Sequence, residues 1–174
     1  MGLTRALTVA LVILVLDQAS KWLIVEVLDL KTRGYIEVAP PFLTFVMAWN
    51  TGINFGLFGN DSDTFRWVLI GIAVAISVAL AVWARSQTGW RAPAAIGLVI
   101  GGAIGNAIDR MHYGSVADFL NMSCCGIENP YAFNIADIAI FLGALVLILF
   151  TGTSEKDARD DPAPPGTDGR AGGA

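Results

Sequence analysis

The sequence predicts an all-α membrane protein with four transmembrane helices and a small β-sheet and loop on one face. The 174-residue chain is 55% hydrophobic and only 15% charged. Its mean hydropathy is +0.61, which is far too apolar for an ordinary soluble domain. Four apolar segments have, or nearly have, the length that crosses a hydrocarbon core of about 30 Å. Strand-like runs and most polar motifs fall between these segments.

The first span is expected at residues 3–25 and contains a polar interruption at residues 17–21. Arg5 followed by an apolar run is also compatible with a cleaved signal peptide. The apolar stretch resumes at Trp22, however, and no good small-x-small cleavage site is present, so a retained helix is favoured. The other spans are expected at 65–83, 92–108 and 135–150. The last two are short and should borrow length from their flanks.

Two larger connecting segments, 26–64 and 109–134, should lie on one face, with both termini and a short turn on the other. Residues 35–38 and 43–49 resemble strands separated by two prolines, which predicts a small sheet on the membrane surface. The membrane domain is expected to cover residues 1–152. The remaining segment, 153–174, is rich in Pro, Gly, Asp and Ala, a composition typical of disorder.

The third predicted helix carries Gly97, Gly101 and Gly105 at four-residue spacing. Small residues on one helical stripe allow a neighbouring backbone to approach closely, as they do in membrane helix packing. The stripe is mainly a packing signal. Its consequence is functional, because close packing would bring Asn106 and Asp109 near the other helices.

Charge and cysteine content exclude several classes of function. Half of the net charge of −4 lies in the C-terminal segment 153–174. No basic cluster indicates nucleic-acid binding, so membrane lipids are the dominant expected partner. The only cysteines, Cys124 and Cys125, are adjacent, and a disulfide between neighbours is strained. They support neither a disulfide framework nor a metal site. No metal and no cofactor are expected.

Asp118 and Asp137 are the candidate catalytic residues, because they lie beside apolar segments that otherwise exclude charge. A carboxylate at a transmembrane helix centre costs about 2.5–3.5 kcal/mol on insertion scales, and less near the interface. A chain that accepts such a cost usually uses the group. Two carboxyl groups that can share one proton are able to activate a water molecule.

Each neighbouring polar motif also has a structural interpretation. Asn106, Asp109 and Arg110 share one helix end, where an Asp109–Arg110 ion pair could fix the departing loop. Asn134 and Asp137 have the spacing of helix N-terminal capping residues. Capping alone does not explain why further polar residues gather on this face.

For two further motifs, a structural role and a functional role both remain open. Asp17 and Lys21, four residues apart, could dock the first helix or serve catalysis. The stretch Asn50–Gly56, which includes Gly52, could hold an extended ligand, although alone it is only a turn. His112, the sole histidine, is better suited to a surface than a catalytic role, and no Ser-His-Asp arrangement forms without it.

Taken together and in order, these blocks closely resemble the bacterial lipoprotein signal peptidases, or type II signal peptidases. The resemblance covers roughly residues 5–150. It rests on five blocks: Asp-Gln-Ala-Ser-Lys at 17–21, Asn50–Gly56, the glycine-rich run from Gly101 to Arg110, Val116–Phe119, and Phe133–Asp137. One departure is Asn54, where many members carry a small apolar residue, and it puts that loop's side-chain contacts in question.

The resemblance implies an intramembrane aspartic endopeptidase that removes signal peptides from diacylglyceryl-modified prolipoproteins, cutting before the lipidated cysteine. Asp118 and Asp137 match its catalytic pair. The matching supporting or substrate-binding positions are Asp17, Lys21, Asn50, Gly52, Asn106, Asp109, Arg110 and Asn134. The resemblance also implies a location in the bacterial inner membrane, with cytoplasmic termini and tail, an extracytoplasmic sheet and an active site near the periplasmic face. The positive charges leave this orientation open. A monomer is expected, although no sequence feature fixes the oligomeric state.

Two other classes compete with this interpretation. In a proton- or cation-coupled transporter the acids would form a relay, but neither broken helices nor internal repeats are apparent. A non-catalytic membrane assembly factor is the other alternative. Substituting either acid by asparagine separates all three, because only a protease should lose peptide cleavage while still folding and binding substrate.

Overall fold

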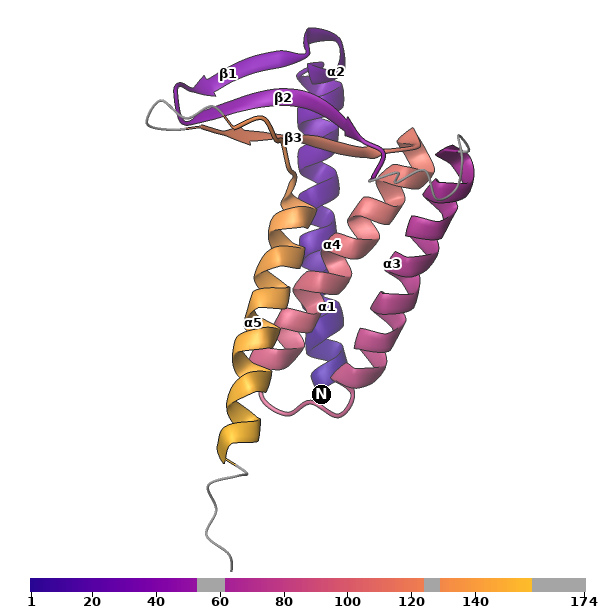
Figure 1. Cartoon of the computed structure of the whole chain (residues 1–174), viewed down its shortest axis with the longest axis vertical. Helices are drawn as coiled ribbons and strands as arrows, with labels where there is room; N and C mark the ends of the chain where they lie inside the picture. The colour runs from indigo at the N-terminus through magenta and orange to yellow at the C-terminus, as the bar shows by residue number, and fades with distance from the viewer. Residues whose placement is uncertain (53–61, 124–128, 158–174) are drawn as a thin grey trace, which may run out of the picture.

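The computed structural model describes residues 1–52, 62–123 and 129–157, of which residues 62 and 150–157 are described by their backbone alone. The elements in chain order are α1 (Gly2–Lys21), the π-helical segment η1 (Trp22–Val27), α2 (Leu30–Arg33), β1 (Tyr35–Ala39), β2 (Leu43–Asn50), α3 (Ser62–Ala84), α4 (Arg91–Tyr113), β3 (Val116–Met122) and α5 (Ile135–Asp157). The long helices form a bundle, and the sheet lies across the end opposite the N-terminus (Figure 1).

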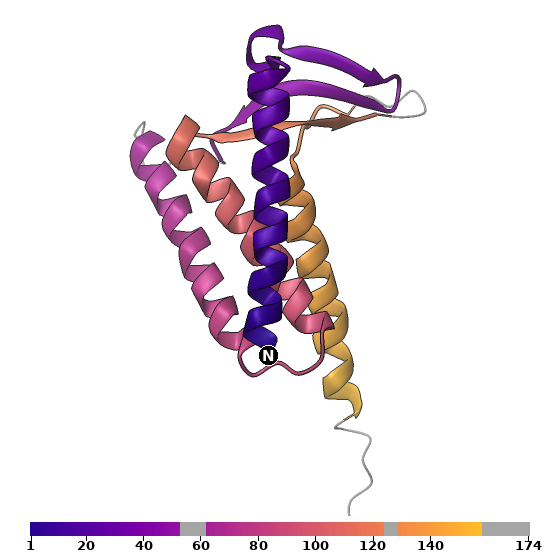
Figure 2. The same cartoon turned by 180° about the vertical axis from the view of Figure 1, so that it is seen from behind.

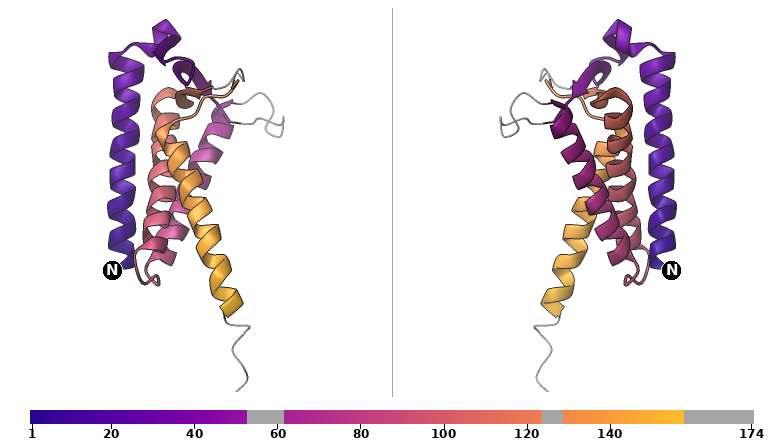
Figure 3. Two further views of the ribbon diagram at one scale, coloured as in Figure 1. Left: turned by 90° about the vertical axis from the view of Figure 1, so that its left-hand side faces the viewer. Right: turned by 90° about the vertical axis from the view of Figure 1, so that its right-hand side faces the viewer.

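Helix α4 is the central helix of the bundle and packs against α1, α3 and α5. Seen from behind, α1 crosses in front of α4 (Figure 2). The side views show α5 diverging from α1 toward the end away from the sheet (Figure 3). Among the three long apolar helices of the described residues, α4 is the one whose span is mostly buried, which fits its glycine-rich sequence. Few residues of the α3 span are buried.

The glycine stripe of α4 lets α1 approach closely, as its spacing predicts. A Cβ atom added to Gly101 would lie 2.6 Å from the carbonyl oxygen of Ala10, and one on Gly105 would lie 2.6 Å from Asp17 Oδ2. Gly97 meets the backbone of Ala6 in the same way. The neighbouring Gly102 faces α5 instead, against Ala136. Glycine on two sides of one helix therefore brings α1 and α5 together around α4.

The sheet is antiparallel with the order β1-β2-β3. The two strands expected from the first loop are confirmed as β1 and β2. The third strand, β3, lies in a segment that was expected to be a loop, and Ala48 of β2 pairs with Asp118 there. An apolar cluster beneath the sheet, which includes Val25, Leu30 and Phe119, fixes it on the end of α1.

The helices differ in length from the predicted spans. Helix α4 continues to Tyr113, five residues beyond the predicted end, so Asp109 and Arg110 lie on a helix and not in a loop. The first span is extended by η1, and α5 ends at Asp157. Three described helices are long and apolar enough to cross a membrane, and the apolar part of α5 is shorter, at Ile135–Leu149. Most of the predicted disordered tail lies outside the described residues.

Candidate active site

Asp118 lies on β3 and is almost fully buried, with 3% of its surface exposed. Two asparagine side chains donate to its carboxylate. Asn134 Nδ2 is 2.6 Å from Oδ1, and Asn50 Nδ2 is 3.1 Å from Oδ2. Asn50 ends β2, and the antiparallel register puts it on the same sheet face as Asp118. The sheet therefore fixes one carboxyl group above the helix bundle.

Asp137 lies in the first turn of α5, directly below the sheet. Asn134 and Asp137 form a reciprocal cap at this helix start. The Asp137 backbone N–H donates to Asn134 Oδ1 at 2.9 Å, and the Asn134 backbone N–H donates to Asp137 Oδ2 at 3.3 Å. This is the geometry of a capping box with Asn and Asp as its members. The same side chains that begin the helix thus orient the candidate acid.

Asn134 also joins the two carboxyl groups to each other. Its side chain donates to Asp118 while its backbone donates to Asp137. Asn106 completes the link from α4: its Nδ2 donates to Asp137 Oδ1 at 2.9 Å, and its Oδ1 accepts from Asn134 Nδ2 at 3.2 Å. Two acids that lie 19 positions apart in the sequence are therefore joined through Asn134 at one end of the bundle.

The electrostatic environment disfavours two negative charges at this point. Burial, followed by the neighbouring charge of Asp137, raises the pKa of Asp118 to about 6. The hydrogen bonds from Asn50 and Asn134, and the more distant charge of Lys21, oppose this shift only in part. A carboxyl group with such a pKa exchanges its proton near neutral pH, which is the property required of a general acid or base.

Lys21 supplies a buried positive charge behind the candidate acids. Its Nζ is 2.8 Å from Asp17 Oδ2 and 2.6 Å from Asp109 Oδ2, and all three side chains are at most 2% exposed. It also donates to Asn106 Oδ1 at 3.3 Å. The ammonium group therefore holds the asparagine that contacts Asp137. Buried charges of this kind are stable only when each has a partner. Gln18 adds to these partners, because its side chain donates to both Asp17 and Asp109.

The two acids paired with Lys21 also hold the backbone near the candidate catalytic residues. Asp17 Oδ1 accepts from the Ala136 N–H at 3.0 Å, next to Asp137. Asp109 Oδ2 accepts from the Ala117 N–H at 3.2 Å, next to Asp118. Neither backbone contact could be inferred from sequence, because alanine carries no side-chain signal.

The structure places Arg110 differently from the sequence expectation. Within the described part of the chain no salt bridge joins Asp109 to Arg110, because successive residues on a helix point about 100° apart. Asp109 faces α1, whereas Arg110 Nη1 donates to the Asn106 carbonyl oxygen at 3.3 Å. Arg110 and Asn106 line the upper end of an apolar groove of about 240 Å³ between α3, α4 and α5.

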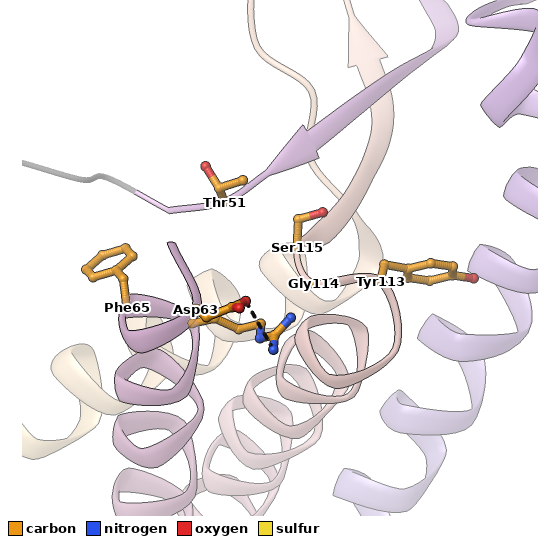
Figure 4. A pocket seen from close by; sticks show the side chains of 7 residues that line it. Thr51, Asp63, Phe65, Tyr113, Gly114 and Ser115 are labelled. Atoms are coloured by element: carbon orange, nitrogen blue, oxygen red, sulfur yellow. Dashed lines mark ion pairs between the residues drawn. The ribbon is translucent and has the colours of Figure 1, made fainter. Parts of the chain in front are cut away.

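Gly52 fixes the end of β2 through its backbone. Its φ of +88° suits glycine, and an added Cβ would lie 2.8 Å from Leu69 and 2.9 Å from Phe65 on α3. The Gly52 N–H donates to Asn50 Oδ1 at 2.9 Å, which turns Asn50 Nδ2 toward Asp118. Beside this turn, Thr51, Arg66, Ser115 and neighbouring residues line a cavity of about 290 Å³ (Figure 4). Asn54, Cys124 and Cys125 lie outside the described residues.

Comparison with known proteins decides the family. The family described as signal peptidase (SPase) II matches residues 9–152. The chain belongs to the signal peptidase II family. It is 44% identical to a lipoprotein signal peptidase of Nitrobacter hamburgensis over 150 residues, covering 84% of this chain and 90% of that protein. It is 41% identical to the lipoprotein signal peptidase of Methylobacterium radiotolerans, covering 92% and 96%.

Solved structures agree with the fold expected of a signal peptidase II. A bacterial membrane enzyme determined by the in meso method at 2.3 Å resolution superposes with a TM-score of 0.70 and 25% sequence identity. The match covers 91% of this chain and 94% of that one. A second bacterial membrane enzyme, at 1.9 Å resolution, gives the same TM-score with 27% identity.

Proposed function

We propose that Asp118 and Asp137 are the catalytic pair with which this signal peptidase, an aspartic endopeptidase, removes signal peptides from prolipoproteins. The observation that carries the proposal is the double contact of Asn134, which bonds to both carboxyl groups. Membership in the signal peptidase II family supplies the reaction. The contacts of Asn134 with both carboxyl groups support the choice of Asp118 and Asp137. All the contacts come from one chain, so a monomer can carry a complete site.

The two acids are suited to different roles. Asp118 lies in the sheet, and its raised pKa favours the protonated form. Asp137 lies in the first turn of α5, where the helix dipole and the Asn134 N–H favour a carboxylate. Asp137 is therefore the general base and Asp118 the general acid at the start of the reaction.

The reaction balances with these two groups and one water molecule. Asp137 takes a proton from the water as its oxygen attacks the scissile carbonyl carbon, and Asp118 gives its proton to the carbonyl oxygen. The tetrahedral intermediate then loses the amine, which takes the proton from Asp137 as the C–N bond breaks. One hydroxyl of the intermediate returns a proton to Asp118. Asn106, Asn134 and Asn50 hold the carboxyl groups in place throughout.

The groove between α3, α4 and α5 supports an approach of the substrate from the bilayer. It is lined by apolar side chains such as Leu69, Ile76 and Ile140, and it ends at Asn106, one hydrogen bond from Asp137. Arg110 lies at that end with a buried Nε that makes no hydrogen bond within the described structure. It is suited to bind a peptide carbonyl, while the diacylglyceryl chains before the cut cysteine remain in lipid.

The proposal is tested by cleavage of a purified, lipidated precursor in vitro. Asp118→Asn and Asp137→Asn should each reduce the cleavage rate by at least about 10³-fold, because neither variant retains the pair of titrating groups. Both should still bind the precursor, as measured by co-purification in detergent. Asp63→Asn, which changes an acid with a largely exposed side chain at the start of α3, serves as the control. Cleavage near the wild-type rate in either active-site variant would refute the assignment.

We further propose that α5 is a fourth membrane span and that the sheet faces the periplasm. Support comes from the position of α5 alongside the other long helices (Figure 1) and from Arg5, Arg85 and Arg91, which lie in or beside the helix ends away from the sheet. After replacement of both native cysteines by serine, an impermeant maleimide should label Glu37→Cys from the periplasmic side. It should label Ser86→Cys only in lysed cells. The reverse pattern would contradict this topology.

A further inference from the structure

Asn50 is held in place by more than its own hydrogen bonds. It is the last residue of β2, and its side chain is exposed apart from its contacts with Asp118 and with the Gly52 N–H. The preceding residue, Trp49, points to the opposite face of the strand because successive strand residues alternate. A contact that holds Trp49 therefore also helps to position the side-chain amide of Asn50, which donates to Asp118.

Trp49 packs on the last residue of α4. The rings of Trp49 and Tyr113 lie 5.2 Å apart between centroids, at 52°. Trp49 remains 43% exposed, so the contact adds little to the apolar core. The effect of the ring contact is instead to connect the end of β2 to the end of α4, the central helix.

Tyr113 is itself tied to the end of the first helix. Its ring points from the end of α4 toward α1 (Figure 4), and its hydroxyl donates to Glu26 Oε1 at 3.3 Å on η1. Glu26 in turn pairs with Lys31 of α2. A continuous path of contacts thus runs from the rigid end of the helix bundle, through two aromatic rings, to the strand residue beside Asn50.

We propose that the Trp49–Tyr113 ring contact, tied to Glu26, positions Asn50 and thereby sets the proton affinity of Asp118. Trp49 and Tyr113 are positioning residues, since they act through Asn50 and touch no reacting atom. Without the contact the end of β2 keeps only its pairing with Ala117 and Val116 of β3. The Asn50 side chain then shifts and stabilises the charged form of Asp118 less well. The inference rests on the proposed role of Asp118 as the general acid.

Other charged groups act on Asp118 from the surrounding elements, and the contact leaves them in place. They are Asp137 on α5, Lys21 on α1 and Arg110 on α4. Among the described residues, no hydrogen bond, ion pair or ring contact joins Trp49 to any of these three, and its ring partner is Tyr113. A change at Trp49 should therefore act on Asp118 mainly through Asn50. An effect confined to Asn50 would distinguish the positioning role of Trp49 from a general disturbance of the active site.

The test is the pH dependence of kcat/KM for cleavage of a lipidated precursor. With Asp118 as general acid, the rate falls as the pH rises through its pKa, and this high-pH limb reports its titration. Asn50→Ala should move the limb upward by about 1 pH unit, because a donor to the carboxylate is lost. Trp49→Ala should move it in the same direction, and the double variant should move it no further than Asn50→Ala alone.

Controls and a second route keep the test decisive. Trp49→Phe retains a ring, so its high-pH limb should lie close to that of the wild type. Trp90→Ala removes an exposed tryptophan far from the sheet and should leave the position of the limb unchanged. Tyr113→Leu removes the same ring contact should Trp49→Ala fail to fold. A limb that stays fixed in Trp49→Ala or Asn50→Ala, or shifts that add in the double variant, would overturn the inference. Full cleavage by Asp118→Asn would instead refute the proposed function.

Discussion

Lys21 shows how a single residue links the site to the bundle. Its ammonium group is shared between Asp17 and Asp109 and also bonds to Asn106. Removing one member of a buried ionic group typically costs about 3–5 kcal/mol, since the remaining charges keep their desolvation penalty without their partner. The main effect of the Lys21 group is therefore on geometry, because it holds in place the residues beside Asp118 and Asp137.

Lys21→Met should lower the free energy of unfolding by about 3–5 kcal/mol, because two buried carboxylates lose their shared cation. Thermal unfolding in detergent, followed by tryptophan fluorescence, measures the loss. Lys31→Met is the matched control. The Lys31–Glu26 pair is partly exposed, with side-chain exposures of 46% and 31%. Solvent screens such a pair, so its loss should change stability much less than the loss of Lys21. Equal effects of the two substitutions would show that burial does not govern the Lys21 group.

Local spacing made some of these residues predictable and left others hidden. Asp17 and Lys21 pair at i, i+4 on one helix, and Asn134 and Asp137 cap another, so both contacts follow from short-range geometry. Lys21 and Asp109 are far apart in the chain, and only the packing of α1 on α4 joins them. The expected Asp109–Arg110 pair was wrong for the same reason, since a nonlocal partner took its place.

Among the elements, α4 has the strictest sequence requirement. Its glycines face α1 on one side and α5 on another, and they place Asn106 between the two. A side chain on the α1 side would push the helices apart and separate Lys21 from Asn106.

Gly105→Ala should reduce cleavage by at least about tenfold, because the added methyl group would lie 2.6 Å from Asp17 Oδ2 and displace a residue that holds α5. The measurement is kcat/KM with a lipidated precursor. Gly71→Ala is the control: it lies within α3, and its added methyl group meets nothing within 4 Å. Reduced cleavage by the control, or wild-type cleavage by Gly105→Ala, would contradict this account of α4.

The elements also show where sequence patterns fail. The strand-like runs on either side of two prolines predict β1 and β2. By contrast, β3 is buried along most of its length and carries the sequence Val-Ala-Asp-Phe-Leu-Asn-Met. Such a run has no clear two-residue period. Its strand conformation depends on pairing with β2, a contact far along the chain. The fourth helix was predicted near its true start because Asn134 and Asp137 are strong N-terminal signals.

At the level of the whole molecule, the raised pKa of Asp118 suits it to catalysis but makes the folded protein less stable at neutral pH. A carboxyl group with a raised pKa binds its proton more tightly in the folded than in the unfolded state. Its contribution to stability is therefore greatest at low pH and is lost as the pH rises through the window between its ordinary value and about 6. Above pH 6 the ionised Asp118 disfavours the fold.

Asp118→Asn should for this reason alter the pH dependence of unfolding. Relative to the variant, the wild type should lose up to about 3 kcal/mol of stability between roughly pH 4 and pH 6, with no further change above that range. Melting curves of both proteins in detergent at several pH values measure the difference. Curves that run parallel across this range would show that Asp118 titrates normally in the folded protein.

The most direct test of the coupled acid pair is the titration of Asp118 itself, followed by carboxyl ¹³C NMR and assigned with Asp118→Asn. In the wild type the Asp118 signal should titrate near pH 6. In Asp137→Asn it should titrate at a lower pH, because the neighbouring charge is gone while burial remains. A wild-type Asp118 that titrates like an ordinary aspartate, or one unaffected by Asp137→Asn, would contradict a shared proton between the two acids.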